Sequence, residues 1–389
     1  MKLQVFVAVL VGAAGCASDG TTGSALSGDG AVGDVQESQD TDGSAASADG
    51  SDDGTDSAAA DGSDSGRDGE LPADGLDAVD GADSAVLTDP PLPDWPDAQP
   101  GLTDPTARQW FRAGAWYKED PDALDKQLHD LFAAASDGQP LGDPQGVVSC
   151  HAGTKASGKT AAKVYSKIVV PDTIIILAPN HMPIGKHAAI WNAGPWIVPG
   201  LAVPTRTDIV ERFLELLPED LEGDRDAFEH QNAHPSEMPG VYLSRKNPNI
   251  KIVQISFFDD EKVDYQDFDA ERVLRVGHAV SKVVKELQDA GEKVLLFGSV
   301  DLSHYEPLAD FDAKDADMME RLQFFDIDGL RTAVIDGNYT ICAEIALSIW
   351  MVAMHDLGFT GLDVTMRGNS VELSGEKSAV GYPGGIVWR

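Results

Sequence analysis

Residues 293–304 read KVLLFGSVDLSH, and this stretch decides the fold that we expect. Its first part, up to Gly298, is mostly apolar, as in a strand that is buried on both faces of a sheet. Its second part is more polar and ends in Asp301 and His304. The stretch therefore predicts a buried strand that carries chemically active side chains at its carboxyl end.

Two further apolar runs end in the same way. Residues 146–149 lead into His151, and residues 173–177 lead towards His181. Ligands of open α/β sheets bind beyond the carboxyl ends of the strands, and parallel strands place these ends on one edge. Each histidine alone is more often a structural hydrogen-bonding residue. Together, the three strand endings predict one shared polar site.

Helical patterns separate these strands. The spacing of apolar residues predicts helices at 122–135, 158–168, 208–217, 270–290, 312–324, 328–336 and 340–357, and a further strand at 250–255. Alternating strands and helices are typical of α/β proteins. We expect a layered α/β fold with a mostly parallel central sheet that is flanked by helices.

The residue types at the strand ends favour a metal site. Imidazole and carboxylate ligands suit zinc, iron, copper or nickel. Cys342 offers a thiolate, because Thr340 fits a helix N-cap and a cysteine in a first helical turn is stabilised in its charged form. Two alternatives stay open for Cys342. It is either a small buried hydrophobic residue or, in an oxidising compartment, half of a disulfide with Cys150.

A separate polar segment contains His234 and Glu237. His234 could act as a ligand or proton carrier, with Glu237 as its orienting partner. His230 is a rival for the same role, and an ordinary polar loop is the simpler interpretation of this segment. The other four histidines do not follow strands, and we interpret them as structural or surface residues: His129, His187, His278 and His355.

The first sixteen residues read as an export signal. Lys2 supplies a positive start, and residues 3–11 form an apolar run that is too short for a permanent membrane helix. Small residues precede Cys16, as in a bacterial lipobox, where the cysteine becomes the lipidated first residue of the mature protein. We expect a lipid anchor in the bacterial cell envelope, on the periplasmic side or the cell surface. An ordinary signal peptide is the alternative.

Residues 17–100 consist mainly of Ala, Asp, Gly and Ser, and Arg67 is their only basic residue. So few apolar groups cannot offset the entropy of ordering the backbone, so we expect a disordered acidic tether. Much of the formal net charge of -36 belongs to it. This acidity argues against a nucleic-acid partner, which needs a basic surface. Residues 101–389 remain as one α/β domain.

Several motifs of this domain resemble the Memo family, also called the AmmeMemoRadiSam system protein B family, over about residues 106–389. The matching segments are Arg112–Tyr117 with Asp120, His151–Gly153, Ala178–His181, Ser299–His304 and Thr340–Cys342.

The resemblance implies a fold similar to class III extradiol dioxygenases, which use non-haem iron. It also implies a metal site formed by His151, His181 and Cys342, with His234, Asp301 and His304 in the same pocket.

Two departures affect the pocket. Ala233 stands where the family has an acidic residue, and Thr154 and Ala156 replace aromatic residues. The resemblance therefore does not carry over a substrate.

We expect a metal-dependent redox enzyme that uses iron or copper, with zinc as a further possibility, on an unknown small molecule. In this interpretation His304 or His234 moves protons, and Asp301 orients a histidine or ligates directly. One alternative is a non-catalytic envelope module that binds metal or another protein. The other is metal-assisted hydrolysis, in which Glu237 activates a bound water.

Thiol labelling under denaturing, non-reducing conditions shows whether Cys342 has an unoxidised thiol or forms a disulfide with Cys150. We expect Cys342 to be labelled as a free thiol, because a metal ligand must keep its sulfur available. A Cys150–Cys342 peptide recovered after proteolysis would remove the cysteine from the site and leave at most histidine and carboxylate ligands.

Overall fold

The computed structural model describes residues 103–136, 142–181, 187–224, 234–258, 268–374 and 379–389. The chain divides into two units, residues 1–81 and 82–389, and every described residue belongs to the second. The predicted signal peptide, the lipidation site Cys16, the predicted tether and His230 lie outside the described residues.

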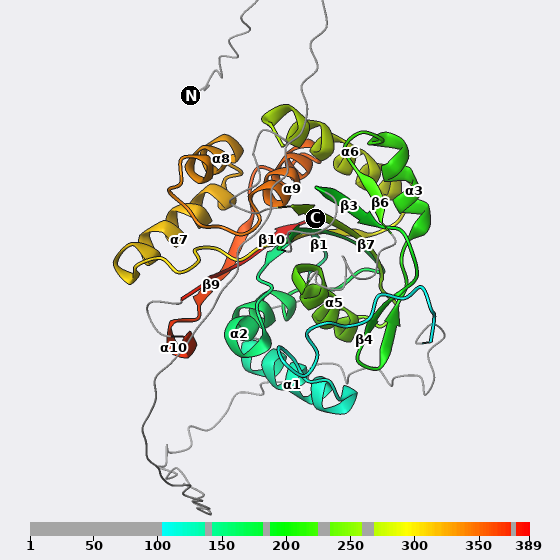
Figure 1. The fold of residues 1–389 in the computed structure, drawn as a ribbon, viewed down its shortest axis with the longest axis horizontal. Coiled ribbons are helices and arrows are strands. Elements are labelled where there is room, and N and C mark those ends of the chain that lie inside the picture. Colours follow the sequence, from blue (N-terminus) through cyan, green and yellow to red (C-terminus); the bar gives the residue numbers. More distant parts are fainter. Residues whose placement is uncertain (1–102, 137–141, 182–186, 225–233, 259–267, 375–378) are drawn as a thin grey trace, which may run out of the picture. The chain divides into compact units, whose positions relative to one another are not determined.

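An eight-stranded sheet forms the centre of the described domain, in the order β6-β3-β7-β2-β8-β1-β10-β9 (Figure 1). Its strands are β1 (Pro144–Ser149), β2 (Thr173–Asn180), β3 (Ala188–Trp191), β6 (Glu222–Asp224), β7 (Lys251–Phe258), β8 (Val294–Ser299), β9 (Asp363–Asn369) and β10 (Gly381–Trp388). Two short strands, β4 (Trp196–Val198) and β5 (Leu201–Val203), pair separately.

The middle of the sheet is parallel. β8 pairs in parallel with β1 and with β2, and β2 pairs in parallel with β7. Antiparallel pairs flank this centre, because β10 runs against β1 and β3 runs against β7. The carboxyl ends of β1, β2 and β8 therefore lie on one edge of the sheet.

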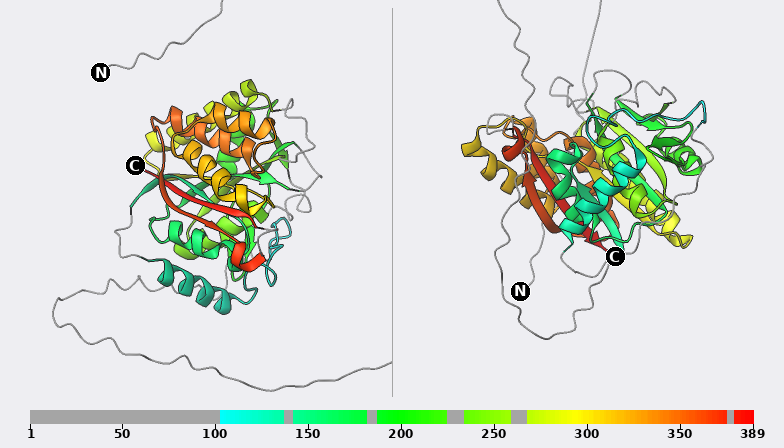
Figure 2. Two further views of the ribbon diagram at one scale, coloured as in Figure 1. Left: turned by 90° about the vertical axis from the view of Figure 1, so that its left-hand side faces the viewer. Right: turned by 90° about the horizontal axis from the view of Figure 1, so that it is seen from below.

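Helices cover both faces of the sheet (Figure 2). They are α1 (Pro121–Ala135), α2 (Thr154–Tyr165), α3 (Thr207–Leu216), α5 (His234–Lys246), α6 (Ala270–Asp289), α7 (Leu308–Gln323), α8 (Ile327–Ile335), α9 (Glu344–Asp356) and α10 (Val371–Ser374).

The central strands are apolar throughout because they contribute to two cores. Ile175 and Leu177 of β2 pack with residues of α6 and α9, whereas Ile174 and Ile176 face α1, α2 and α5. Successive side chains of a strand point to opposite faces, so a strand covered on both faces needs an unbroken apolar run. The predicted layered α/β fold with a mostly parallel sheet is confirmed.

Several predicted boundaries change. α2 begins at Thr154, four residues before the expected start, and β2 continues to Asn180. The helix expected from residue 340 begins only at Glu344. The segment expected to be a polar loop around His234 is the start of α5. β9 and β10 were not predicted, although they complete one side of the sheet.

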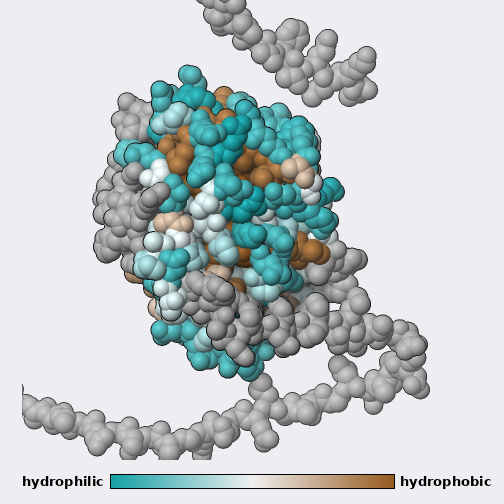
Figure 3. Space-filling model, turned by 90° about the vertical axis from the view of Figure 1, so that its right-hand side faces the viewer, coloured by the Kyte–Doolittle hydropathy of each residue, from teal (hydrophilic) through white to brown (hydrophobic). Residues whose placement is uncertain are grey.

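No helix among the described residues is long and apolar enough to cross a membrane. α9 is the most apolar of them, but it is buried against the sheet and α6 and contains the buried Glu344. The molecular face in Figure 3 is mostly hydrophilic, with hydrophobic side chains in separate patches.

A buried ion pair joins α8 to α9. Arg331 donates from Nη1 to Glu344 Oε1 at 2.8 Å and from Nη2 to the Phe268 carbonyl oxygen at 2.8 Å. Ser348 also donates to Glu344 Oε1. Burial raises the pKa of Glu344, and the Arg331 charge opposes that rise.

The Arg331→Met substitution should lower the free energy of unfolding by about 3 to 5 kcal/mol, because it leaves the Glu344 carboxylate buried without its cation. Urea denaturation measures the change. An Arg331→Met/Glu344→Leu double variant is the control and should recover most of the loss. A double variant that is as unstable as the single one would contradict this account.

Candidate metal centre

The strand ends open into one pocket of about 890 Å³. His151 follows β1, His181 follows β2, and Asp301 and His304 follow β8, and all four side chains line the pocket. The register explains this convergence, because Ser149 lies opposite Ser299 and Leu177 lies opposite Gly298 in neighbouring parallel strands. Cys342 and His234 line the same pocket from other elements.

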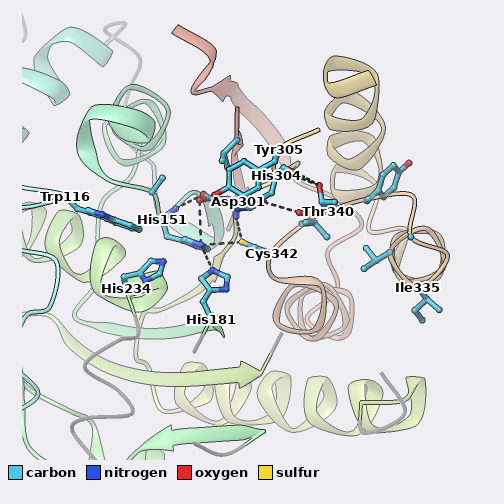
Figure 4. Close-up of a pocket in the computed structure, with 16 residues that line it drawn as sticks. Trp116, His151, His181, His234, Asp301, His304, Tyr305, Ile335, Thr340 and Cys342 are labelled. Carbon is cyan, nitrogen blue, oxygen red and sulfur yellow. Dashed lines mark hydrogen bonds and ion pairs between the residues drawn. The ribbon is translucent and has the colours of Figure 1, made fainter. Parts of the chain in front are cut away.

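Three potential ligand atoms lie close together around His151 (Figure 4). His151 Nε2 is 3.3 Å from His181 Nε2 and 3.4 Å from Cys342 Sγ. His151, His181 and His234 also form a group in which one ligand atom from each lies within 4.8 Å of the others. The geometry thus offers two histidines and a choice of third ligand, Cys342 or His234.

Hydrogen bonds to Ser299 orient the His151 ring. The Ser299 hydroxyl donates to the Pro235 carbonyl oxygen, so its oxygen is left to accept from His151 Nδ1, which is 3.0 Å away. The proton of the neutral ring is therefore on Nδ1, and the lone pair of Nε2 points at His181 and Cys342. Such a partner on the remote nitrogen is the usual arrangement for a metal-binding histidine.

Burial keeps these imidazoles neutral. It lowers the pKa of His181 to about 4, with smaller contributions from His304 and Arg112. It lowers the pKa of His151 well below the usual range, and His181, His234 and His304 add to that effect. A histidine must be neutral to bind a metal. At neutral pH both rings are in the form that binds.

Asp301 lies beside His151 and contacts it twice. Its Oδ1 accepts from the His151 amide at 3.0 Å, and its Oδ2 is 3.7 Å from His151 Nε2. Burial raises the pKa of Asp301 to about 7, while amide hydrogen bonds from His151 and Ala152 oppose the rise. Asp301 is therefore placed to hold His151.

Cys342 is not in a helical turn as expected. α9 starts at Glu344 with Ala343 as its N-cap residue, so Thr340 is not the cap, and the helix-dipole argument for Cys342 does not apply. Its sulfur instead accepts a hydrogen bond from the Asp301 amide at 3.1 Å. An amide donor stabilises a thiolate in the same way as the predicted helix end.

The two described cysteines, Cys150 and Cys342, are not joined in a disulfide. Cys150 is buried, and burial raises the pKa of its thiol to about 12. It therefore stays protonated and packs as a small hydrophobic residue, with the Ser157 carbonyl oxygen 3.7 Å from its sulfur.

The structure does not place Glu237 in the pocket. Its buried carboxylate pairs with Arg108 and accepts from the Phe111 amide, the Arg112 amide and the Tyr117 hydroxyl. The expected direct orientation of His234 and activation of water by Glu237 are not supported, because its oxygens are engaged by these donors. Glu237 instead fixes the segment from Arg108 to Tyr117.

Sequence reasoning missed Arg112 as a site residue, although it was part of a quoted motif. Arg112 Nη2 is 3.4 Å from His234 Nδ1. Its guanidinium lies over the rings of Phe111 and Trp116, each centroid 4.5 Å away. Trp116 lines the pocket and meets the His234 ring edge to face at 4.5 Å. The position of Arg112 directly before the Ala-Gly-x-Trp-Tyr motif was the sequence signal that could have identified it as a site residue.

Apolar and aromatic residues also line the pocket, and their sequence positions showed no motif. They are Tyr305, Val334, Ile335, Tyr339, Ile341 and Val380. The pocket therefore has a polar wall of histidines, Asp301 and Cys342 and an apolar wall built mainly from the α8–α9 region. Tyr305 is 68% exposed at this wall and has a positive φ of 56°.

Comparisons with known proteins agree with this arrangement of motifs. The family described as Memo-like protein matches residues 108–386. The chain is 26% identical to the MEMO1 family protein MTH_45 of Methanothermobacter thermautotrophicus over 283 residues, covering 69% of this chain and 96% of the relative. It is 30% identical to a MEMO1 family protein of Sulfolobus acidocaldarius over 286 residues, covering 69% and 95%.

The Glu237→Gln substitution should lower the free energy of unfolding by about 3 to 5 kcal/mol, because Arg108 is left buried without its anion. The metal content of the folded fraction should not change. Chemical denaturation and metal analysis measure the two effects. Glu215→Gln, at an exposed position, is the control. A stable Glu237→Gln variant would show that the carboxylate does not hold this segment.

Proposed function

This chain belongs to the Memo-like protein family, and we propose that it is a metal-dependent redox protein that binds iron or copper and acts on a small organic molecule. In this proposal His151, His181 and Cys342 hold the ion. The observation that carries the proposal is the convergence of His151 Nε2 with His181 Nε2 and Cys342 Sγ, at 3.3 Å and 3.4 Å.

The distances of His181 Nε2 and Cys342 Sγ from His151 Nε2 each fit two ligands of one ion, and the group whose ligand atoms all lie within 4.8 Å of one another contains His234 in place of Cys342. Nitrogen and sulfur atoms at about 2.0 to 2.3 Å from a tetrahedral ion lie about 3.3 to 3.6 Å apart. The buried, neutral state of His151 and His181 supports the same assignment.

The donor set favours a transition metal. Imidazole suits zinc, copper and iron, and thiolate adds preference for softer ions such as copper(I) and zinc. Of these, iron and copper cycle between oxidation states, which is the chemistry that the ion would supply when bound. Zinc would fill the same site without redox activity.

The pocket residues support action on a small molecule. The cavity volume is within the range of ligand pockets, about 300 to 1,000 Å³. Polar and apolar side chains line the same cavity. The Asp301 carboxylate accepts a hydrogen bond from the His151 amide, and the Asp301 amide donates one to the Cys342 sulfur. His304 and His234 line the cavity as proton-carrying groups.

Two alternatives compete with this proposal. A non-catalytic metal-binding or interaction module would need the same ligands but no substrate pocket. Metal-assisted hydrolysis would need a general base, and Glu237 was the residue expected in that role. Glu237 does not line the pocket, and its carboxylate is bonded to Arg108 and backbone amides.

We also propose that Cys16 carries a lipid anchor and that residues 17–100 tether the domain to the bacterial envelope. The support is the sequence alone: Lys2, the apolar run that follows it, the small residues before Cys16 and the acidic composition after it.

The His181→Ala and Cys342→Ser substitutions should each weaken metal affinity by at least about 100-fold, since loss of outer-shell partners alone costs 10- to 100-fold. Metal analysis after dialysis against a competing chelator measures this and identifies the native ion. His187→Ala, an exposed histidine near the same strand edge, is the matched control. Equal metal content in all three variants would exclude this ligand set.

Oxygen uptake separates the redox proposal from a non-catalytic module. The iron-loaded chain should consume oxygen with at least one member of a catechol and phenol panel, and the compound should persist under anaerobic conditions. The metal-free chain and the His181→Ala variant are the controls. Tight metal binding without oxygen uptake across the panel would favour the binding module.

A further inference from the structure

A buried carboxylate interrupts the apolar face of α7. The buried residues of this helix are Phe311, Asp315, Met318, Met319 and Leu322, and the side chain of Asp315 is fully buried among them. Their spacing is that of the core-facing side of an amphipathic helix, where a charged group is costly. Packing alone therefore does not explain an aspartate at this position.

The Asp315 carboxylate reaches the segment that follows β8. Its Oδ1 accepts a hydrogen bond from the Ser303 amide at 3.1 Å. Ser303 lies between Asp301 and His304, whose side chains line the pocket. The other oxygen, Oδ2, has no hydrogen-bond partner among the described residues. The bond to the Ser303 amide is thus the contact through which Asp315 can act on the pocket.

Every backbone amide of residues 300–305 has an acceptor. In chain order, these acceptors are the Ser149 carbonyl oxygen, the Cys342 sulfur, the Gly381 carbonyl oxygen, the Asp315 carboxylate, the Thr340 hydroxyl and the Ala379 carbonyl oxygen. Asp315 supplies the only carboxylate of this set. A hydrogen bond to an ionised acceptor is stronger than one between neutral groups, so the bond to Ser303 restrains the segment more than its neutral neighbours do.

Gly381 leaves room for this carboxylate. A Cβ atom at position 381 would lie 2.1 Å from Asp315 Oδ2, which is too close for any side chain. The Gly381 amide also donates to the Ser303 carbonyl oxygen at 2.9 Å. Ser303 is thus held at its amide by α7 and at its carbonyl group by β10.

The buried charge of Asp315 has a cost in stability. Burial raises the pKa of Asp315 to about 6, while the hydrogen bonds from Ser303 and the charge of Arg367 oppose the rise. Asp315 is therefore ionised at neutral pH, in a state that is less favourable in the folded chain than in water. Residues that break the local pattern in this way are typical of functional sites.

We propose that Asp315 is a positioning residue that sets the place of Asp301 and His304 in the pocket. It acts through the Ser303 amide, and Gly381 admits its carboxylate. The inference deepens the proposed function and rests on it for the metal, whereas the position of the segment is a property of the protein alone.

The positioned segment contacts two of the proposed metal ligands. Asp301 Oδ1 accepts from the His151 amide at 3.0 Å, and the Asp301 amide donates to Cys342 Sγ at 3.1 Å. Asp301 is two residues from Ser303, so a displacement of Ser303 changes both contacts. Metal affinity should therefore depend on Asp315, although Asp315 is not among the described residues that line the pocket.

NMR of the metal-free full chain, labelled with nitrogen-15 only at histidine, tests the positioning role. The His151 amide reports on its bond to Asp301, and the His304 amide reports on the end of the segment. The variants His151→Gln and His304→Gln identify the two signals. The amide of His278, in α6, is the internal control.

Asp315→Leu should shift the His151 and His304 amide signals, because Ser303 loses its acceptor. Asp315→Asn should shift them much less, because its side-chain oxygen can still accept. Glu320→Gln, which removes an exposed carboxylate of α7, is the matched control and should shift neither. Unchanged signals in a folded Asp315→Leu chain would overturn the proposal. Equal shifts in the Asn and Leu variants would overturn it too, because they would assign the effect to packing.

Gly381 gives a second test, which does not need Asp315→Leu to fold. Gly381→Ala alone should lower the urea midpoint and shift the His304 amide, because its Cβ displaces the carboxylate. In an Asp315→Ala background the same substitution should have a much smaller effect, since the oxygen that it meets is gone. Equal effects in both backgrounds would show that Gly381 does not admit Asp315 and would overturn the proposal.

Zinc titration separates this inference from the proposed function. Asp315→Leu should weaken zinc affinity by about 10-fold or more, as the loss of an outer-shell partner does. Asp315→Asn and Glu320→Gln should stay close to the unchanged chain. If the unchanged chain and Asp315→Leu bind zinc equally well, Asp315 does not act on the ligands and the proposal is overturned. If none of the chains binds zinc, the proposed metal site fails, while the amide signals still decide the positioning role.

Discussion

β8 pairs in parallel with β1 on one side and with β2 on the other, and these two ladders run without a register shift up to the pocket. The pairing brings the residues after all three strands to one edge of the sheet. His151, His181 and Asp301 meet there although up to 150 residues separate them in the chain. A one-residue slip of either ladder would turn every side chain to the other face.

Burial of polar groups imposes a second constraint on this edge. A carboxylate removed from water needs partners, and Glu237 finds them in Arg108, two backbone amides and Tyr117. The same contacts fix the segment that carries Arg112 and Trp116 beside His234. The residue that we expected to take part in chemistry thus holds the segment from Arg108 to Tyr117, and its effect reaches His234 through Arg112.

The electrostatics of the pocket follow from burial more than from net charge. The chain is strongly acidic overall, yet desolvation keeps the His151 and His181 rings neutral. Asp301 is the buried carboxylate within contact of His151, and burial brings its pKa to about 7. A fixed hydrogen-bond partner, the Ser299 hydroxyl, then places the proton of the His151 ring on Nδ1.

The sequence alone was sufficient for the layered α/β fold and for the meeting of His151, His181, Asp301 and His304, because apolar runs and strand direction are local properties. The family motifs added Cys342. The tertiary structure alone decided the rest. Glu237 is engaged by Arg108 and two backbone amides, Cys342 precedes α9 by two residues, and Arg112 reaches His234. These contacts join segments far apart in the chain, and no local pattern encodes which oxygen, amide or ring they will meet.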